Sequence, residues 1–84
     1  MSKGKQPVLD LHGFKTDDVE EKVDQFLHLH NSKGTPSIKI MTGKGTGAVR
    51  QLVIKYLKQG NYPWSYEKLP NGTNNEGVLI VHLE

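Results

Sequence analysis

The alternation of short strand-like runs with two amphipathic helical patterns constrains this chain more than any other feature. Apolar runs predict strands at residues 8–11, 37–41, 64–69 and 78–83. Apolar residues three and four positions apart predict one helix from a cap at Thr16 to a stop at Gly34, and a second between Gly47 and Gly60. A polar loop rich in Asn and Gly is expected at residues 70–77.

The resulting order, β-α-β-α-β-β, predicts an α/β domain of the two-layer α+β kind. Each strand–helix–strand unit should connect parallel strands by a right-handed crossover, and the last two strands should form an antiparallel hairpin. We therefore expect a four-stranded mixed sheet with both helices on one face, which leaves the other face free to meet a partner. Residues 8–84 would form this domain, and residues 1–7 a flexible tail.

The composition limits how the fold can be stabilised and where the protein works. The 84 residues include no cysteine, so neither disulfides nor thiolate metal sites can help, and stability must come from the 35% of residues that are hydrophobic. No apolar run approaches the ~20 residues of a membrane span, and residues 1–7 lack the apolar centre of a signal peptide. We expect a cytoplasmic monomer with no membrane partner.

The segment Thr42-Gly43-Lys44-Gly45-Thr46-Gly47 is a glycine-rich turn between a strand and a helix. Its backbone N–H groups could approach an anion closely, the helix adds its positive N-terminus, and Lys44 adds a full charge. The spacing fits neither the phosphate loop of nucleotide hydrolases nor a dinucleotide-binding fingerprint. The glycines could have the purely structural role of allowing a tight connection between strand and helix. The pattern nevertheless favours phosphate as the ligand, and Arg50 would extend the positively charged surface.

Asp10 and His12 end the first predicted strand on the face opposite Leu9 and Leu11. Because the carboxyl ends of neighbouring parallel strands lie at one sheet edge, both side chains should approach the turn that follows the second strand. His12 could then transfer a proton, while Asp10 orients it, acts as a base or holds a divalent ion. Alternatively, either side chain could cap the next helix, or His12 could bond to the turn backbone.

The other histidines and the aromatic residues suggest more ordinary roles. His28 and His30 point to different sides of one helix and His82 lies in the last strand, so we predict no zinc site. Tyr62, Trp64 and Tyr66 occupy every second position and could stack unpaired bases. Packing against the sheet or the helices is the commoner role of such residues.

Together the two motifs resemble those of the small MutS-related (Smr) domain family. That family opens with a Leu-Asp-Leu-His-Gly strand end, here residues 9–13, and continues through an amphipathic helix to a [Thr/His]-Gly-x-Gly turn, here residues 42–45. The similarity covers residues 8–83 and includes the order of elements. One departure precedes the last strand, where the family tends to have Gly-Gly-x-Gly-Ala and this chain has Asn74-Asn75-Glu76-Gly77-Val78. Glu76 would repel phosphate if it faced the site.

The resemblance implies a fold like the C-terminal domain of translation initiation factor three. It also implies binding of DNA or RNA, with nicking or endonuclease activity in some members. Carried over to this sequence, it assigns catalysis to Asp10 and His12. The nucleic-acid-binding residues predicted from the resemblance and from the chemistry of the turn are Thr42, Gly43, Lys44, Gly45, Thr46, Gly47 and Arg50. A magnesium or manganese ion could assist, although the sequence identifies no ligand set for it.

We therefore predict an Smr-type nucleic-acid-binding domain that acts as an endonuclease or nickase on branched, gapped or single-stranded DNA or RNA. The alternative is a non-catalytic module that recognises nucleic-acid structure, which the low net charge of +2 favours. A small-molecule phosphate enzyme would need a deep pocket, which so small a domain rarely builds.

Overall fold

The computed structural model describes residues 6–43 and 47–83. Its elements follow the predicted β-α-β-α-β-β order and are β1 (Val8–Asp10), α1 (Thr16–Ser32), β2 (Ser37–Met41), α2 (Ala48–Gln59), β3 (Trp64–Lys68) and β4 (Asn74–His82). Thr16 is the first residue of α1 and not its cap; Lys15 takes the cap position, and no side chain caps the helix. Asp17 and Asp18 in the first turn favour the positive helix end instead.

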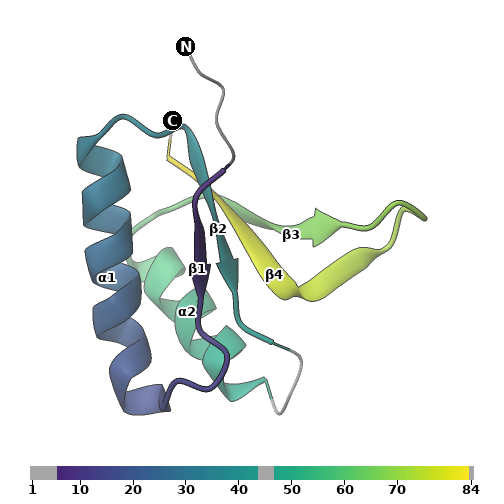
Figure 1. The fold of residues 1–84 in the computed structure, drawn as a ribbon, viewed down its shortest axis with the longest axis horizontal. Helices are drawn as coiled ribbons and strands as arrows, with labels where there is room; N and C mark the ends of the chain where they lie inside the picture. Colours follow the sequence, from purple (N-terminus) through teal and green to yellow (C-terminus); the bar gives the residue numbers. More distant parts are fainter. Residues whose placement is uncertain (1–5, 44–46, 84) are drawn as a thin grey trace.

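The four strands form one mixed sheet in the order β1-β2-β4-β3. Strand β1 pairs with β2 in parallel, and β4 runs antiparallel to both of its neighbours, β2 and β3. Strand β3 therefore has the same direction as β2, as two right-handed crossovers predict, while β4 is inserted between them. Both helices cover the same face of the sheet (Figure 1). The predicted two-layer fold is confirmed.

The core lies between the sheet and the two helices. Alternate strand residues face it, so that Leu9 lies opposite Ile40 and Ile40 opposite Leu79. The helices contribute residues at helical spacing, which is why their apolar stripes are continuous. The fully buried side chains of this core are Leu11, Val19, Val23, Leu27, Ile38, Ile40, Val53, Leu57, Leu79 and Val81.

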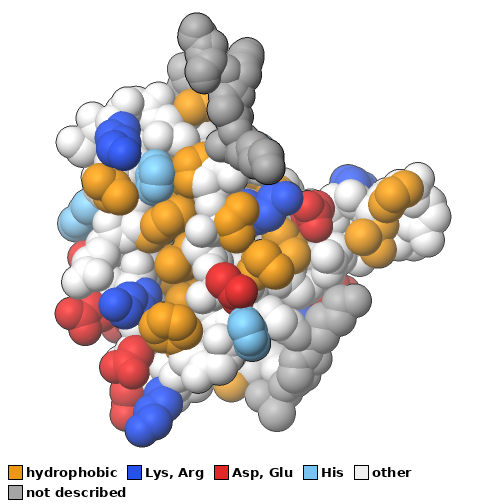
Figure 2. Space-filling model, viewed as in Figure 1, with side chains coloured by type: hydrophobic (Ala, Val, Ile, Leu, Met, Phe, Trp, Pro, Cys, Tyr) orange, Lys and Arg blue, Asp and Glu red, His pale blue; other side chains and the backbone are white. Residues whose placement is uncertain are grey.

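The other face of the sheet has no helix over it. Val8 and Asp10 of β1 and Met41 of β2 are exposed there, and Figure 2 shows hydrophobic side chains gathered across the middle of this face. Lys39 is half-buried, with its Nζ 2.8 Å from Oε2 of Glu67 on β3. The face that the sequence predicts as free to meet a partner is therefore partly apolar.

The β3–β4 hairpin departs from the sequence prediction. Residues 74–77, predicted as loop, belong to β4, because Asn74 and Asn75 pair with Lys68 and Glu67 of β3. The next paired residues are Tyr66 of β3 and Leu79 of β4. Residues 76–78 therefore have no partner on β3 and form a bulge. Beyond the bulge the hairpin projects from the body of the domain (Figure 1).

Tyr62, Trp64 and Tyr66 pack against the core. The rings of Trp64 and Tyr66 meet edge to face with centroids 5.1 Å apart. The packing role expected for these aromatic residues is therefore present, and stacking of bases on them stays a prediction.

At the start of the described chain, Gln6 and Pro7 are already bonded to β2. The Gln6 amide donates to Ser37 Oγ at 2.7 Å, and the Pro7 carbonyl accepts from the Lys39 backbone N–H at 2.8 Å. Residues 1–5, the rest of the predicted tail, lie outside the described residues. Neither α1 nor α2 is long and apolar enough to cross a membrane.

Two leucines of α1 provide a matched test of this core. Leu27 is fully buried, whereas Leu29 is 49% exposed. Leu27→Ala should lower the free energy of unfolding by about 2–5 kcal/mol, because it removes buried methyl groups and leaves a cavity. Leu29→Ala makes the same change in helix propensity but removes a half-exposed side chain. It should lower the free energy of unfolding by less than about 1 kcal/mol. Urea denaturation followed by circular dichroism measures both, and equal losses would contradict the packing.

Candidate functional site

The end of β1 is shaped by a tight turn. The Phe14 backbone N–H donates to the Leu11 carbonyl at 3.0 Å, and Gly13 between them has φ +82°, as in a type II turn. Glycine adopts this φ without strain, whereas other residues rarely do. Because Leu11 is buried in the core, Asp10 and His12 on either side of it are held together on the open side of the sheet.

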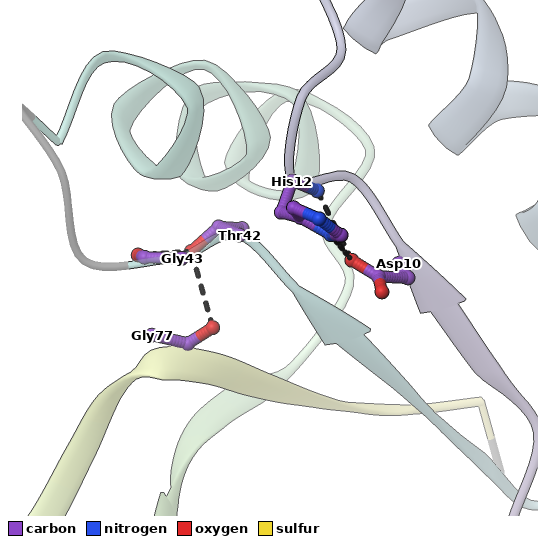
Figure 3. Close-up of polar contacts among 5 residues, drawn as sticks. All are labelled: Asp10, His12, Thr42, Gly43 and Gly77. Carbon is purple, nitrogen blue, oxygen red and sulfur yellow. Dashed lines mark hydrogen bonds and ion pairs between the residues drawn. The ribbon is translucent and has the colours of Figure 1, made fainter.

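Asp10 and His12 form a hydrogen-bonded pair (Figure 3). His12 Nδ1 lies 2.9 Å from Asp10 Oδ1, and the His12 backbone N–H donates to the same oxygen at 3.1 Å. An ionised carboxylate only accepts, so Nδ1 carries the hydrogen and Nε2 of neutral His12 keeps a free lone pair. The His12 side chain is 79% exposed and the Asp10 side chain 48% exposed. Nε2 of His12 is therefore accessible to water and to a large substrate.

The hydrogen bonds of the pair also set the charge of Asp10. The bond from the His12 side chain, followed by the bond from the His12 backbone, holds the pKa of the Asp10 carboxyl below its ordinary value of 3.8. The turn backbone is bonded by Asp10, which accepts from the His12 N–H, and not by the His12 side chain, whose bond is to the Asp10 carboxyl. Neither residue caps α1.

The end of β2 is fixed by a single carbonyl of β4. The Gly77 carbonyl accepts from the backbone N–H groups of Thr42 at 2.8 Å and Gly43 at 3.2 Å (Figure 3). The Thr42 side chain is only 7% exposed, and its hydroxyl lies 3.4 Å from the same carbonyl. Thr42 thus ties β2 to β4, and binding of nucleic acid by its hydroxyl stays a prediction.

The glycine-rich turn is described only in part. Lys44, Gly45 and Thr46 lie outside the described residues. Gly47 is the cap residue of α2, with φ +87°, and as a glycine it has no side chain to cap the helix. The first turn of α2 contains no acidic residue, so nothing on the helix itself offsets its positive end.

Arg50 lies beside this helix start but is not a free cation. Its Nη1 is 3.7 Å from Glu76 Oε1, and its side chain is 22% exposed. A Cβ on Gly47 would lie 3.2 Å from Arg50 Nη2, so the glycine leaves room for the guanidinium. Arg50 Nε is buried and has no hydrogen-bond partner among the described residues. Glu76, the acid expected to repel phosphate, does face the start of α2, where it offsets the charge of Arg50.

A pocket of about 230 Å³ joins these parts. Asp10 of β1 and His12 of the following turn line it, together with Met41 of β2, Gly43 just after β2, and Val78 of β4. Of the glycine-rich turn, Gly43 lies at the predicted sheet edge with Asp10 and His12, and Lys44, Gly45 and Thr46 fall outside the described residues. Gly43 was among the predicted site residues, whereas sequence reasoning missed Met41, Asn75, Gly77 and Val78. Gly77 ends a polar segment that has the composition of a loop, so no local signal revealed the bulge.

The donor groups at this edge do not by themselves form a metal cage. Among residues 6–43 and 47–83, no three His, Cys, Asp or Glu side chains come together. A magnesium ion beside Asp10 would take its remaining ligands from water and from phosphate oxygens of a substrate.

Comparison with known proteins relates the chain to one group. Residues 9–84 match the Smr domain family. The endonuclease MutS2 of Levilactobacillus brevis is 35% identical over 83 residues, 99% of this chain and 10% of that protein. The endonuclease MutS2 of Lactiplantibacillus plantarum is 37% identical over 78 residues, 93% of this chain and 10% of that protein. The chain thus spans about a tenth of the length of these curated relatives.

Two solved structures share the fold. The Smr domain of Thermus thermophilus MutS2 superposes with a TM-score of 0.76 at 30% identity, over 90% of this chain and 95% of that one. YdaL, a stand-alone small MutS-related protein from Escherichia coli, superposes with a TM-score of 0.78 at 22% identity, over 94% of this chain and 67% of that one. At that identity, the second likeness concerns the fold alone.

The Asp10–His12 bond can be tested by titration. His12→Ala should raise the pKa of the Asp10 carboxyl toward 3.8, because the largest cause of its depression is lost while the backbone N–H remains. Carbon-detected NMR of the carboxyl against pH measures this. His28→Ala, which removes a histidine paired with Asp24 on α1, should leave the Asp10 curve unchanged. An Asp10 curve that is identical in wild type and His12→Ala would refute the pairing.

Proposed function

The chain belongs to the Smr domain family, and from that premise we propose that it binds DNA or RNA and cuts it as an endonuclease. The observation that carries the proposal is the exposed, hydrogen-bonded Asp10–His12 pair at the sheet edge where the glycine-rich turn begins. The curated relatives named as endonucleases support the nuclease class. The substrates we propose are branched, gapped or single-stranded regions, met in the cytoplasm.

In the proposed reaction, His12 acts as a general base. Its Nε2 takes the proton of the attacking oxygen, which belongs to water or, in RNA, to the neighbouring 2′-hydroxyl. That oxygen bonds to phosphorus, the bond from phosphorus to the leaving sugar oxygen breaks, and the leaving oxygen takes a proton from solvent. Asp10 holds the ring with Nδ1 protonated and stabilises the imidazolium that forms, as the aspartate does in the Ser-His-Asp triad.

Binding of the phosphate backbone is assigned to the turn and to the start of α2. Lys44 supplies the charge, and the start of α2 supplies a positive helix end. Gly45, Thr46 and Gly47 supply the surrounding backbone of this turn, while Thr42 and Gly43, whose N–H groups donate to Gly77, anchor its start.

Cleavage of labelled branched DNA and structured RNA tests the proposal, each with magnesium, with manganese and with a chelator. His12→Ala should slow cutting by about 10²–10⁴-fold, the usual range for loss of a general base. Asp10→Asn should slow it less, because the amide oxygen can still accept from Nδ1–H while the negative charge is lost. His28→Ala serves as the control and should cut at the wild-type rate. An Asp10→Ala, His12→Ala double variant that cuts as fast as wild type would show that the site is wrongly assigned.

The ion pair between Arg50 and Glu76 favours a second candidate, a non-catalytic module that recognises nucleic-acid structure. Glu76 lowers the positive potential where phosphate would bind, which suits weak and reversible binding. This candidate predicts salt-sensitive binding that Lys44→Ala weakens, measured by fluorescence anisotropy at several salt concentrations. It also predicts intact strands in every metal condition, so scission by the wild-type protein alone would rule it out.

A further inference from the structure

The pocket beside Asp10 and His12 has an apolar floor. Met41 and Val78 lie opposite each other on β2 and β4, in the same cross-strand row as Asp10 on β1. Both face the side of the sheet that the helices leave open, and both line the pocket. The charged pair and this apolar floor therefore share one hollow on the surface.

The bulge in β4 makes the far wall of the pocket. Residues 76–78 leave the ladder with β3 while Gly77 stays tied to Thr42 and Gly43 by its carbonyl. The Asn75 side chain is held at both ends, since its oxygen accepts from the Gly77 N–H at 3.1 Å and its nitrogen donates to Glu67 at 3.3 Å. The wall is thus fixed by hydrogen bonds within the protein.

We propose that this pocket receives one unpaired base of the strand whose phosphodiester lies at Asp10 and His12. The inference rests on the proposed function and names its substrate class: nucleic acid with at least one unstacked base next to the bond that is cut. Met41 and Val78 would contact the flat face of the base, while the sugar and phosphate reach the rim at His12.

The size and chemistry of the pocket favour this occupant. At about 230 Å³ it lies below the ~300–1,000 Å³ of pockets for drug-sized ligands, so it suits one ring system and not a base pair. A metal ion or a free phosphate would gain nothing from Met41 and Val78, whereas a base has a large apolar face to bury. Unstacking costs least where a base is already unpaired, so the pocket selects single-stranded and gapped regions.

Methionine labelling gives a direct readout. The chain contains two methionines, Met1 and Met41, so a sample labelled at the methionine methyl carbons has two signals, of which Met41→Leu assigns one. Deoxyadenosine monophosphate should shift the Met41 signal saturably, while deoxyribose 5-phosphate, which lacks the base, should not. Equal shifts with both ligands, or no shift of the Met41 signal at saturating nucleotide, would overturn the inference.

Oligonucleotide binding separates this inference from the proposed cutting. In the Asp10→Asn, His12→Ala background, where cutting is removed, an intact single strand should bind about tenfold more tightly than a matched strand with abasic sites or a blunt duplex. Met41→Ala should abolish that preference. Val8→Ala, on the same face but outside the pocket, should keep it.

The two failures have different signatures. A wild-type protein that cuts no substrate but keeps the preference for intact single strands contradicts the proposed endonuclease and supports the base pocket. A protein that cuts intact and abasic strands equally well, and binds them equally, contradicts the pocket and leaves the endonuclease standing.

Discussion

Strand β2 is paired on both sides, and its register places the candidate site. Pairing with β1 sets Asp10 opposite Met41, and pairing with β4 sets Met41 opposite Val78. Since side chains alternate along a strand, a slip by one residue would send Met41 toward the helices and expose Ile40. The burial of Ile38 and Ile40 forbids that slip. The apolar core on one face of the sheet therefore keeps the polar site in register on the other.

The parts that the sequence predicted correctly are those encoded by local periodicity and by chain topology. The helices, the strands and the meeting of Asp10 with the end of β2 follow from apolar spacing and from the handedness of the crossover. The extension of β4 to Asn74 was not predictable, because Asn and Gly are typical of loops and only pairing with β3 makes that segment a strand. Thr42 has a hydroxyl suited to phosphate, but its burial depends on Gly77.

Acids on the β3–β4 hairpin weaken the attraction of this face for phosphate. Glu67 pairs with Lys39, and Glu76 pairs with Arg50, which the sequence suggests as a phosphate contact, so both cations already have acidic partners. Such partly exposed pairs add little to stability. Their larger effect is to lower the positive electrostatic potential around Lys39 and Arg50. The low net charge of +2 means that few other cations compensate for this decrease. Residues 74–78, where the sequence departs from the pattern given above for the family, thus contribute both the acid that pairs with Arg50 and the bulge in β4.

The exposure of His12 has a kinetic consequence. Enzymes that close over a substrate hold the reacting bond in place and exclude water, whereas most of the His12 side chain faces solvent in this domain. Under the proposed function, the chance that a scissile bond reacts during one encounter would depend on the residence time of the substrate on this surface. Tethering to another nucleic-acid-binding unit can raise the effective concentration of a substrate to about the millimolar range. An isolated copy of this domain should therefore turn over slowly, and its rate should rise with the number of surfaces that hold the same strand.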